Sequence, residues 1–194
     1  MFSIFKRKPK GIIADLALED FYSTLTTAEI EEIKDSLAHP YQLSSRPYTR
    51  DDLDKGSRTY GRNAAVFLYN MAEGGVSLNL KKRLLIESYN RTTCASDRYF
   101  TSMSLVELLY KEGDYEACES YCLKVIDDYP ELKLDRVIKD VDIFAFHRLA
   151  IMYEKQGRIQ DAINISELAL EYGQHDGTKN GFTGRITRLR KKLI

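Results

Sequence analysis

Residues 105–130 read LVELLYKEGDYEACESYCLKVIDDYP, and residues 149–169 read LAIMYEKQGRIQDAINISELA. The two segments align when Gly113 is placed on Gly157. Each then has an apolar helical pattern, a glycine turn and a second helical pattern with small residues at the same offsets. Self-similarity on this scale is typical of stacked helical hairpins, in which each unit buries its apolar face against the next. The sequence therefore predicts an array of antiparallel helices in this half of the chain.

The rest of the chain also favours helix. It has only four prolines among 194 residues, and no run of alternating apolar and polar residues predicts a strand. Thr26 followed by Glu29 is a capping-box pattern that opens a helix ending near Ala38. The other predicted helices cover residues 12–24, 57–72, 77–90, 97–112, 114–128, 141–156, 158–172 and 183–193.

The predicted organisation has three parts. Residues 1–10 form a basic flexible tail, and residues 11–56 form N-terminal helices followed by a long loop over residues 39–56. Residues 57–194 form the array of helical hairpins, which we expect to make one structural unit with residues 11–56. The fold class is therefore all-α.

The two aligned segments resemble tetratricopeptide repeats, over residues 97–130 and 141–174. That family has an aromatic residue, Leu-Gly and Tyr in its first helix, then Ala, Phe, Ala and a closing Pro. The second segment has at these places Phe146, Leu149-Ala150, Tyr153, Ala162, Ser166, Ala169 and Gln174. The first segment has Ser102, Leu105-Val106, Leu109, Cys118, Cys122, Val125 and Pro130. The resemblance implies a right-handed α-array, with residues 183–193 as a C-terminal capping helix.

The two glycines are 44 positions apart, whereas the family repeats about every 34 residues. The excess corresponds to ELKLDRVIKD, residues 131–140, which either lengthens a helix or makes a loop between the repeats. Small residues at the repeat positions let paired helices approach closely. We therefore expect Cys118, Ala162 and Ala169 to be buried.

The resemblance also implies where a partner binds, because the first helices of such repeats line a concave groove. By position the groove residues are Phe100, Met103, Glu107, Tyr110, Lys111, Phe144, His147, Ile151, Glu154 and Lys155. Apolar and aromatic groups of this kind anchor a segment, and charges orient it. We expect a non-catalytic adaptor or regulatory module that binds a protein or a short peptide. Self-association through the groove is a variant of this hypothesis.

No catalytic, cofactor or metal-binding pattern stands out. Cys118 and Cys122 lie four residues apart and so share a helix face, which a metal site could use. Both also fall at small packing positions of the repeat, so we expect buried structural thiols without a metal. The three histidines are scattered, at positions 39, 147 and 175. We therefore expect no enzyme and no cofactor; a catalytic site in the loop over residues 41–62 is the least favoured alternative.

The alternative function is association with nucleic acid. Arg46, Arg50, Lys55, Arg58 and Arg62 alternate with Tyr48 and Tyr60, a mixture that can stack on bases and bind phosphates. The predicted C-terminal helix adds Arg185, Arg188, Arg190, Lys191 and Lys192. Nearby aspartates nearly neutralise the first set, and cations at a helix C-terminus complement its dipole. We therefore expect a protein partner rather than a nucleic acid.

The overall charge and the cysteine content limit the kinds of partner and the cellular compartment that we expect. Lys and Arg total 29, as do Asp and Glu, so that no net field draws the protein to nucleic acid. Three cysteines are too few and odd in number for a disulfide framework. The N-terminal segment lacks the order of a secretory signal, and no apolar stretch is long enough to span a bilayer. We expect a cytoplasmic protein with no membrane partner.

Overall fold

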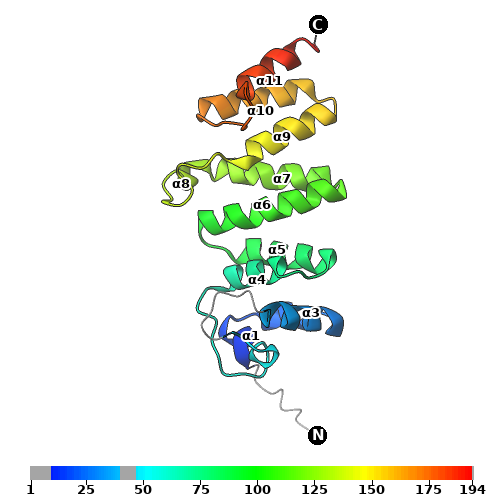
Figure 1. Ribbon diagram of the computed structural model, residues 1–194, viewed down its shortest axis with the longest axis vertical. Coiled ribbons are helices and arrows are strands. Elements are labelled where there is room, and N and C mark those ends of the chain that lie inside the picture. The colour runs from blue at the N-terminus through cyan, green and yellow to red at the C-terminus, as the bar shows by residue number, and fades with distance from the viewer. Residues whose placement is uncertain (1–9, 40–46, 194) are drawn as a thin grey trace. The chain divides into compact units, whose positions relative to one another are not determined.

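The computed structural model describes residues 10–39 and 47–193, and the predicted tail residues 1–9 lie outside this range. Within the described ranges the chain has eleven α-helices, one short 3-10 helix and no strand, so that the all-α prediction is confirmed. The chain divides into two compact units, residues 1–93 and 94–194 (Figure 1). The boundary leaves the two repeat-like segments together in the second unit.

The first unit contains α1 (Gly11–Asp15), α2 (Glu19–Ser23), α3 (Thr27–Leu37), the 3-10 helix η1 (Arg50–Asp52), α4 (Ala64–Glu73) and α5 (Leu78–Arg91). The predicted single helix over residues 12–24 is wrong. The chain turns at Ala17, whose φ is 51°, and the Leu18 N–H bonds to the Ile13 carbonyl at 2.9 Å. The turn buries Leu18 completely, together with Ile12. Burial of Leu18 thus offsets the cost of a left-handed alanine.

The helix predicted to begin at residue 57 begins only at Ala64. Asn63 caps it, with its side-chain oxygen accepting from the Val66 N–H at 2.9 Å. The preceding residues are held in a non-helical path by other contacts. The Tyr60 N–H donates to the Asp15 carboxylate at 3.1 Å, and the Tyr60 ring packs edge-on against Phe67 at 4.9 Å. A helix through residue 60 would lose both contacts.

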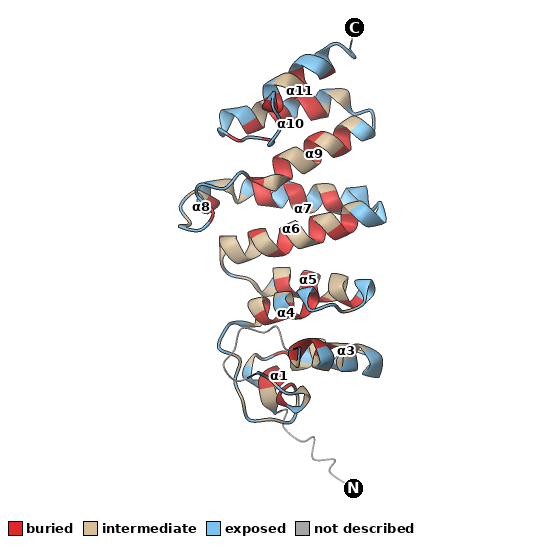
Figure 2. Ribbon diagram, viewed as in Figure 1, coloured by how far each residue is buried: buried red, intermediate tan, exposed pale blue. Residues whose placement is uncertain are grey.

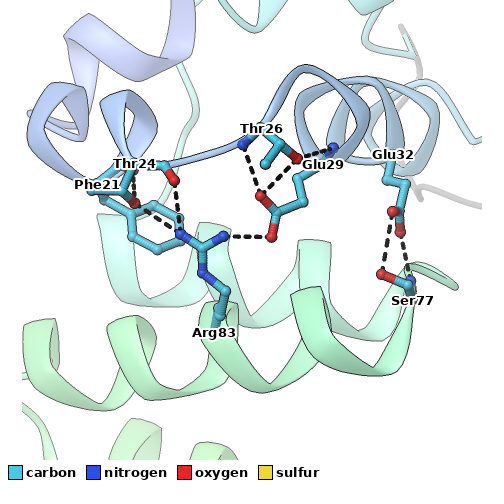
Figure 3. Close-up of polar contacts among 7 residues, drawn as sticks. All are labelled: Phe21, Thr24, Thr26, Glu29, Glu32, Ser77 and Arg83. Atoms are coloured by element: carbon cyan, nitrogen blue, oxygen red, sulfur yellow. Dashed lines mark hydrogen bonds and ion pairs between the residues drawn. The ribbon is translucent and has the colours of Figure 1, made fainter.

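A polar network ties α3 and the α2–α3 junction to α5 (Figure 3). The capping box at Thr26 and Glu29 is present, as predicted. The Glu29 carboxylate also accepts from Arg83 of α5, whose guanidinium donates to the Thr24 carbonyl at 3.1 Å and hydroxyl at 2.9 Å. One arginine therefore satisfies groups at the end of α2 and at the start of α3. Further along α3, Glu32 accepts from the backbone N–H of Ser77 at 2.6 Å.

The second unit contains α6 (Ala95–Glu112), α7 (Tyr115–Asp127), α8 (Tyr129–Leu132), α9 (Phe144–Lys155), α10 (Ile159–Glu171) and α11 (Gly181–Arg190). α6 pairs with α7, α9 with both α7 and α10, and α10 with α11. Figure 1 shows these helices stacked in chain order, with α8 at the side. The buried residues lie along the facing sides of the helices (Figure 2).

The two hairpins have the same turn. The Asp114 N–H bonds to the Leu109 carbonyl at 3.0 Å, and the Arg158 N–H bonds to the Tyr153 carbonyl at 2.9 Å. Gly113 and Gly157 have φ values of 79° and 74°, a left-handed conformation that glycine adopts without a Cβ penalty. Both turns thus end the first helix and reverse the chain with one geometry.

The predicted small packing positions are buried: Cys118, Ala162 and Ala169 have no exposed surface. The open ends of the hairpins are closed by different polar contacts. In the first hairpin Arg98 pairs with Asp128 at 2.9 Å, and in the second the buried Gln174 accepts from the Ile143 N–H at 2.6 Å. Gln174 stands where the resembling family has proline, and its amide makes a contact that proline would not.

The extra residues between the hairpins were predicted either to lengthen a helix or to form a loop, and they form a loop. After the short α8, Leu132 and Ile138 are buried, and the Lys133 ammonium bonds to the Lys139 carbonyl at 2.8 Å. At the other end of the unit, α11 ends at Arg190, three residues before its predicted end. Leu193 lies beyond the end of α11 and is exposed.

Candidate binding face of the second unit

Long side chains connect the first helices of the two hairpins, α6 and α9, at three points. The Tyr99 ring lies 5.5 Å from the Phe144 ring, Glu107 pairs with Arg148, and Tyr110 bonds to Lys155. The residue numbers rise together along both helices, so that α6 and α9 run in the same direction, while α9 packs mainly against α7 and α10. We call the surface formed by the ten predicted groove residues and their charged partners the α6–α9 face.

None of the ten predicted groove residues is buried in the core. Lys111 and Lys155 are exposed, and the other eight are partly buried: Phe100, Met103, Glu107, Tyr110, Phe144, His147, Ile151 and Glu154. Partly buried side chains of this kind are fixed by their neighbours and still present surface to a partner. The structure brings Tyr110 together with Lys155, and Phe100 and Phe144 each against Tyr99.

Tyr110 is the centre of the contacts between α6 and α9. Its hydroxyl accepts a hydrogen bond of 2.5 Å from the Lys155 ammonium, which raises the pKa of Lys155. The Arg148 guanidinium lies 4.3 Å from the ring centroid of Tyr110, within range of a cation–π interaction, and the same guanidinium pairs with Glu107. Two cations therefore share one aromatic ring at this point of the face.

Glu154 connects α9 to α11 and is surrounded by cations. Its carboxylate pairs with Arg188, with Lys192 at 2.9 Å and with Arg185 at 3.4 Å. Hydrogen bonds from Arg188 and Lys192 outweigh the opposing effect of burial and lower the pKa of Glu154 to about 2. Glu154 therefore stays ionised throughout the physiological range.

His147 lies about two helical turns before Glu154 in α9, close enough to α11 for the charge of Arg185 to act on it. Burial lowers its pKa, and the positive charge of Arg185 lowers it further, while Asp176 acts in the opposite direction. Asp176 is itself buried and pairs with Arg185 at 3.5 Å. His147 is therefore a neutral imidazole near neutral pH.

Sequence reasoning missed the contribution of Arg148 and of α11 to this face. Arg148 directly follows the predicted His147 and was assigned no role, although it stacks on Tyr110. Arg185, Arg188 and Lys192 were predicted to lie on the polar sides of a capping helix. Their spacing of three and four residues places them on one helix side, a signal that could have assigned them to a common partner.

The second candidate site considered in the sequence is the pair of cysteines in α7. Cys118 and Cys122 are buried, and the hydrogen bond between them and burial both raise the pKa of the Cys122 thiol. Across the part of the chain that the structure describes, no group of three or more His, Cys, Asp and Glu side chains could hold a metal ion.

A depression of about 220 Å³ is lined by Tyr153, Arg158, Asp161, Asn164, Ile165 and Leu168. Within it Arg158 pairs with Glu119 and Asp161.

Three cations of the basic loop in the first unit, Arg50, Lys55 and Arg58, are paired with carboxylates. Arg50 pairs with Glu31 and Asp35, Lys55 with Asp51 at 3.5 Å, and Arg58 with Asp52 at 3.6 Å. The Arg58 guanidinium also lies 4.1 Å from the ring centroid of Tyr48. Arg46 lies outside the described residues. The aromatic and basic groups of this loop thus contact one another and the acids beside them.

The chain was compared with protein-family models, with curated proteins and with solved structures, and none of the three comparisons found a match. In residues 10–39 and 47–193 no helix combines the length and the apolar character needed to cross a membrane.

Proposed function

We propose that the second unit is a non-catalytic binding module that holds a protein or peptide segment on the α6–α9 face. The observation that carries this proposal is the matched set of contacts between α6 and α9. Phe144 contacts Tyr99, Arg148 contacts Glu107, and Lys155 contacts Tyr110. Tyr99 is buried, and the other five residues are partly buried or exposed, so that they present aromatic and charged groups at the surface. Surfaces of this composition bind other proteins.

The tetratricopeptide-like character of the unit belongs to the same proposal. It is supported by the equal turns at Gly113 and Gly157, by the buried small residues and by the parallel first helices. The loop between the hairpins allows them to stack although they are 44 residues apart in the sequence. With two hairpins and α11 the face is short, so that its ligand is a short segment or one side of a helix. A second copy of the chain is one such ligand.

The experiment that tests this function is partner capture from the native host, with protein identification by mass spectrometry. Tyr110→Ala combined with Lys155→Ala should lose the captured partner and keep the helical content of the protein. The matched control is Tyr121→Ala combined with Lys124→Ala. This pair is also a lysine over a tyrosine ring, at 4.6 Å, but on α7, outside the face.

Two results would contradict the proposal. One is a partner that both double variants retain, and the other is equal loss of the partner from both. Circular dichroism and thermal melting of each variant show whether a loss reflects unfolding. If the Tyr110 and Lys155 variant unfolds, these residues are structural and the assignment of the face is wrong.

A further inference from the structure

The charges of the α6–α9 face are unbalanced, and the imbalance indicates the chemistry of its ligand. The charged groups that meet there are the cations Arg148, Lys155, Arg185, Arg188 and Lys192 and the carboxylates Glu107, Glu154 and Asp176. His147 adds no charge near neutral pH. The face is therefore basic on a protein whose total charge is zero.

The surplus positive charge is concentrated around Glu154. This single carboxylate can satisfy several hydrogen-bond donors, but it neutralises only one of the three cations around it. Asp176 compensates Arg185, which leaves Arg188 and Lys192 sharing Glu154. Their side chains are 50% and 48% exposed, whereas that of Glu154 is 17% exposed. The cationic groups thus reach solvent above a carboxylate that lies beneath them.

Lys155 is a further cation of the face, and its contacts are with Tyr110 and not with a carboxylate. Lys155 follows Glu154 in α9 and donates to the neutral hydroxyl of Tyr110. Ile151, partly buried, stands one turn before Lys155 and gives the same region an apolar group. Exposed cations at Glu154 and Lys155, one turn from an apolar side chain of the same helix, match a segment that carries carboxylates next to an apolar anchor.

We propose that the α6–α9 face selects an acidic peptide segment, whose carboxylates bind Arg188, Lys192 and Lys155 while an apolar side chain packs at Ile151. This inference rests on the proposed function and adds the charge of the ligand. Protein carboxylates fit better than a nucleic acid, because nucleic-acid binders neutralise many phosphates along an extended basic surface. Here the surplus is small and local, and the neighbouring Arg190 is paired with Glu167 of α10 at 2.7 Å.

The test uses the full chain and a fluorescent peptide of about 12 residues that alternates Glu and Asp around two leucines. The control peptide, called the amide probe, has Gln and Asn at the acidic positions. Fluorescence anisotropy should show the acidic probe binding at least about tenfold more tightly than the amide probe, with the difference shrinking as salt is added. Equal binding of the two probes, or no binding of the acidic probe, would overturn the inference.

The variants locate the interaction. Arg188→Gln with Lys192→Gln should weaken binding of the acidic probe by at least about fivefold. Arg190→Gln with Lys191→Gln removes the same two types of charge from the same C-terminal segment and should change binding by less than about twofold. If the two double variants lose affinity equally, the attraction is a general charge effect and the inference is wrong. Displacement of the acidic probe by a short single-stranded RNA at lower concentration would also overturn it, in favour of a nucleic-acid ligand.

The results separate this inference from the function on which it rests. If both probes bind equally and Tyr110→Ala with Lys155→Ala abolishes both, the face binds peptides without selecting acidic ones. The proposed function then stands and the charge inference falls. If the acidic probe binds and the Tyr110 and Lys155 variant retains a partner captured from the host, the acidic site is present but that partner binds elsewhere. The proposed function then fails.

Discussion

The hydroxyl of Tyr110 in α6 accepts a hydrogen bond from the ammonium of Lys155 in α9, and the two residues lie 45 positions apart in the sequence. Each occupies the last turn of its helix, directly before the glycine turn of its hairpin. The contact therefore aligns the ends of the two first helices. It also places a lysine over an aromatic ring at a distance of 5.1 Å.

Replacing Tyr110 with Phe keeps the ring and removes the hydroxyl. The pKa of Lys155, which this hydroxyl raises, should then fall toward its ordinary value. NMR titration of the lysine side-chain signals measures the change. Tyr115→Phe is the control, because its ring lies 5.7 Å from that of Tyr110 but its hydroxyl is not the group bonded to Lys155. An unchanged pKa in Tyr110→Phe would mean that the hydrogen bond does not persist in solution.

Glu154 should make the stability of the second unit depend on pH. Its pKa is about 2 in the folded chain and 4.5 ordinarily, so its contribution to the free energy of unfolding is complete above the ordinary value. The contribution should be lost as the pH falls from 4.5 through about 2. After allowance for solvent screening we expect a loss on the order of 1–2 kcal/mol.

Glu154→Gln has no carboxylate to protonate at this position, so it should flatten that part of the pH dependence. Urea unfolding of both proteins across this pH range is the measurement. A matched control is Glu167→Gln, which removes the carboxylate that pairs with the exposed Arg190. Parallel curves for the parent chain and Glu154→Gln would contradict the cation-sharing geometry.

A larger residue at Ala162 should destabilise the second hairpin. Ala162 has no exposed surface, so that Ala162→Leu must displace neighbouring helices. The expected cost is about 1–3 kcal/mol in the free energy of unfolding, measured by denaturant titration. Gln160→Leu puts the same side chain at an exposed position of α10 and should cost much less. Equal costs would show that the effect comes from helix propensity and not from packing.

Arg83 should be a main polar tie of the first unit. Arg83→Met keeps much of the side-chain length but removes the contacts to Glu29 and Thr24, with an expected loss of about 1–2 kcal/mol in the free energy of unfolding. Lys81→Met, two residues earlier in α5, removes a single pair with Glu73 and should cost about 0.5 kcal/mol or less. Denaturant unfolding compares the two, and a smaller effect at Arg83 than at Lys81 would contradict the network in Figure 3.

The features that the sequence predicted well are those encoded locally. The capping box at Thr26 and the left-handed glycines at the hairpin turns depend on residues a few positions apart, so that their patterns can be read directly. The break at Ala17 and the late start of α4 depend on distant partners. Leu18 leaves the helical path to become buried, and Tyr60 is held by Asp15 and Phe67, contacts that no local pattern contains.

The binding face shows the same division. Periodicity and the resemblance predicted which residues of α6 and α9 lie on one side of each helix, because such a prediction depends on one helix at a time. The role of Arg188 and Lys192 depends on the packing of α11 against α10, which brings them to Glu154 of α9, so that charge composition alone suggested only a solvated helix end. Glu154 was predicted to lie on the face. The three cations that surround it come from a distant part of the sequence, so that only the structure identifies them.

The loop after α8 is a place where the length of the chain can change. Its buried Leu132 and Ile138 anchor it, whereas Leu134 is 84% exposed, and the helices on either side meet through α7 and α9 without its help. Chain added or removed near Leu134 therefore leaves the hairpin stack intact. We expect this segment to carry a label or a foreign epitope without disturbing the α6–α9 face.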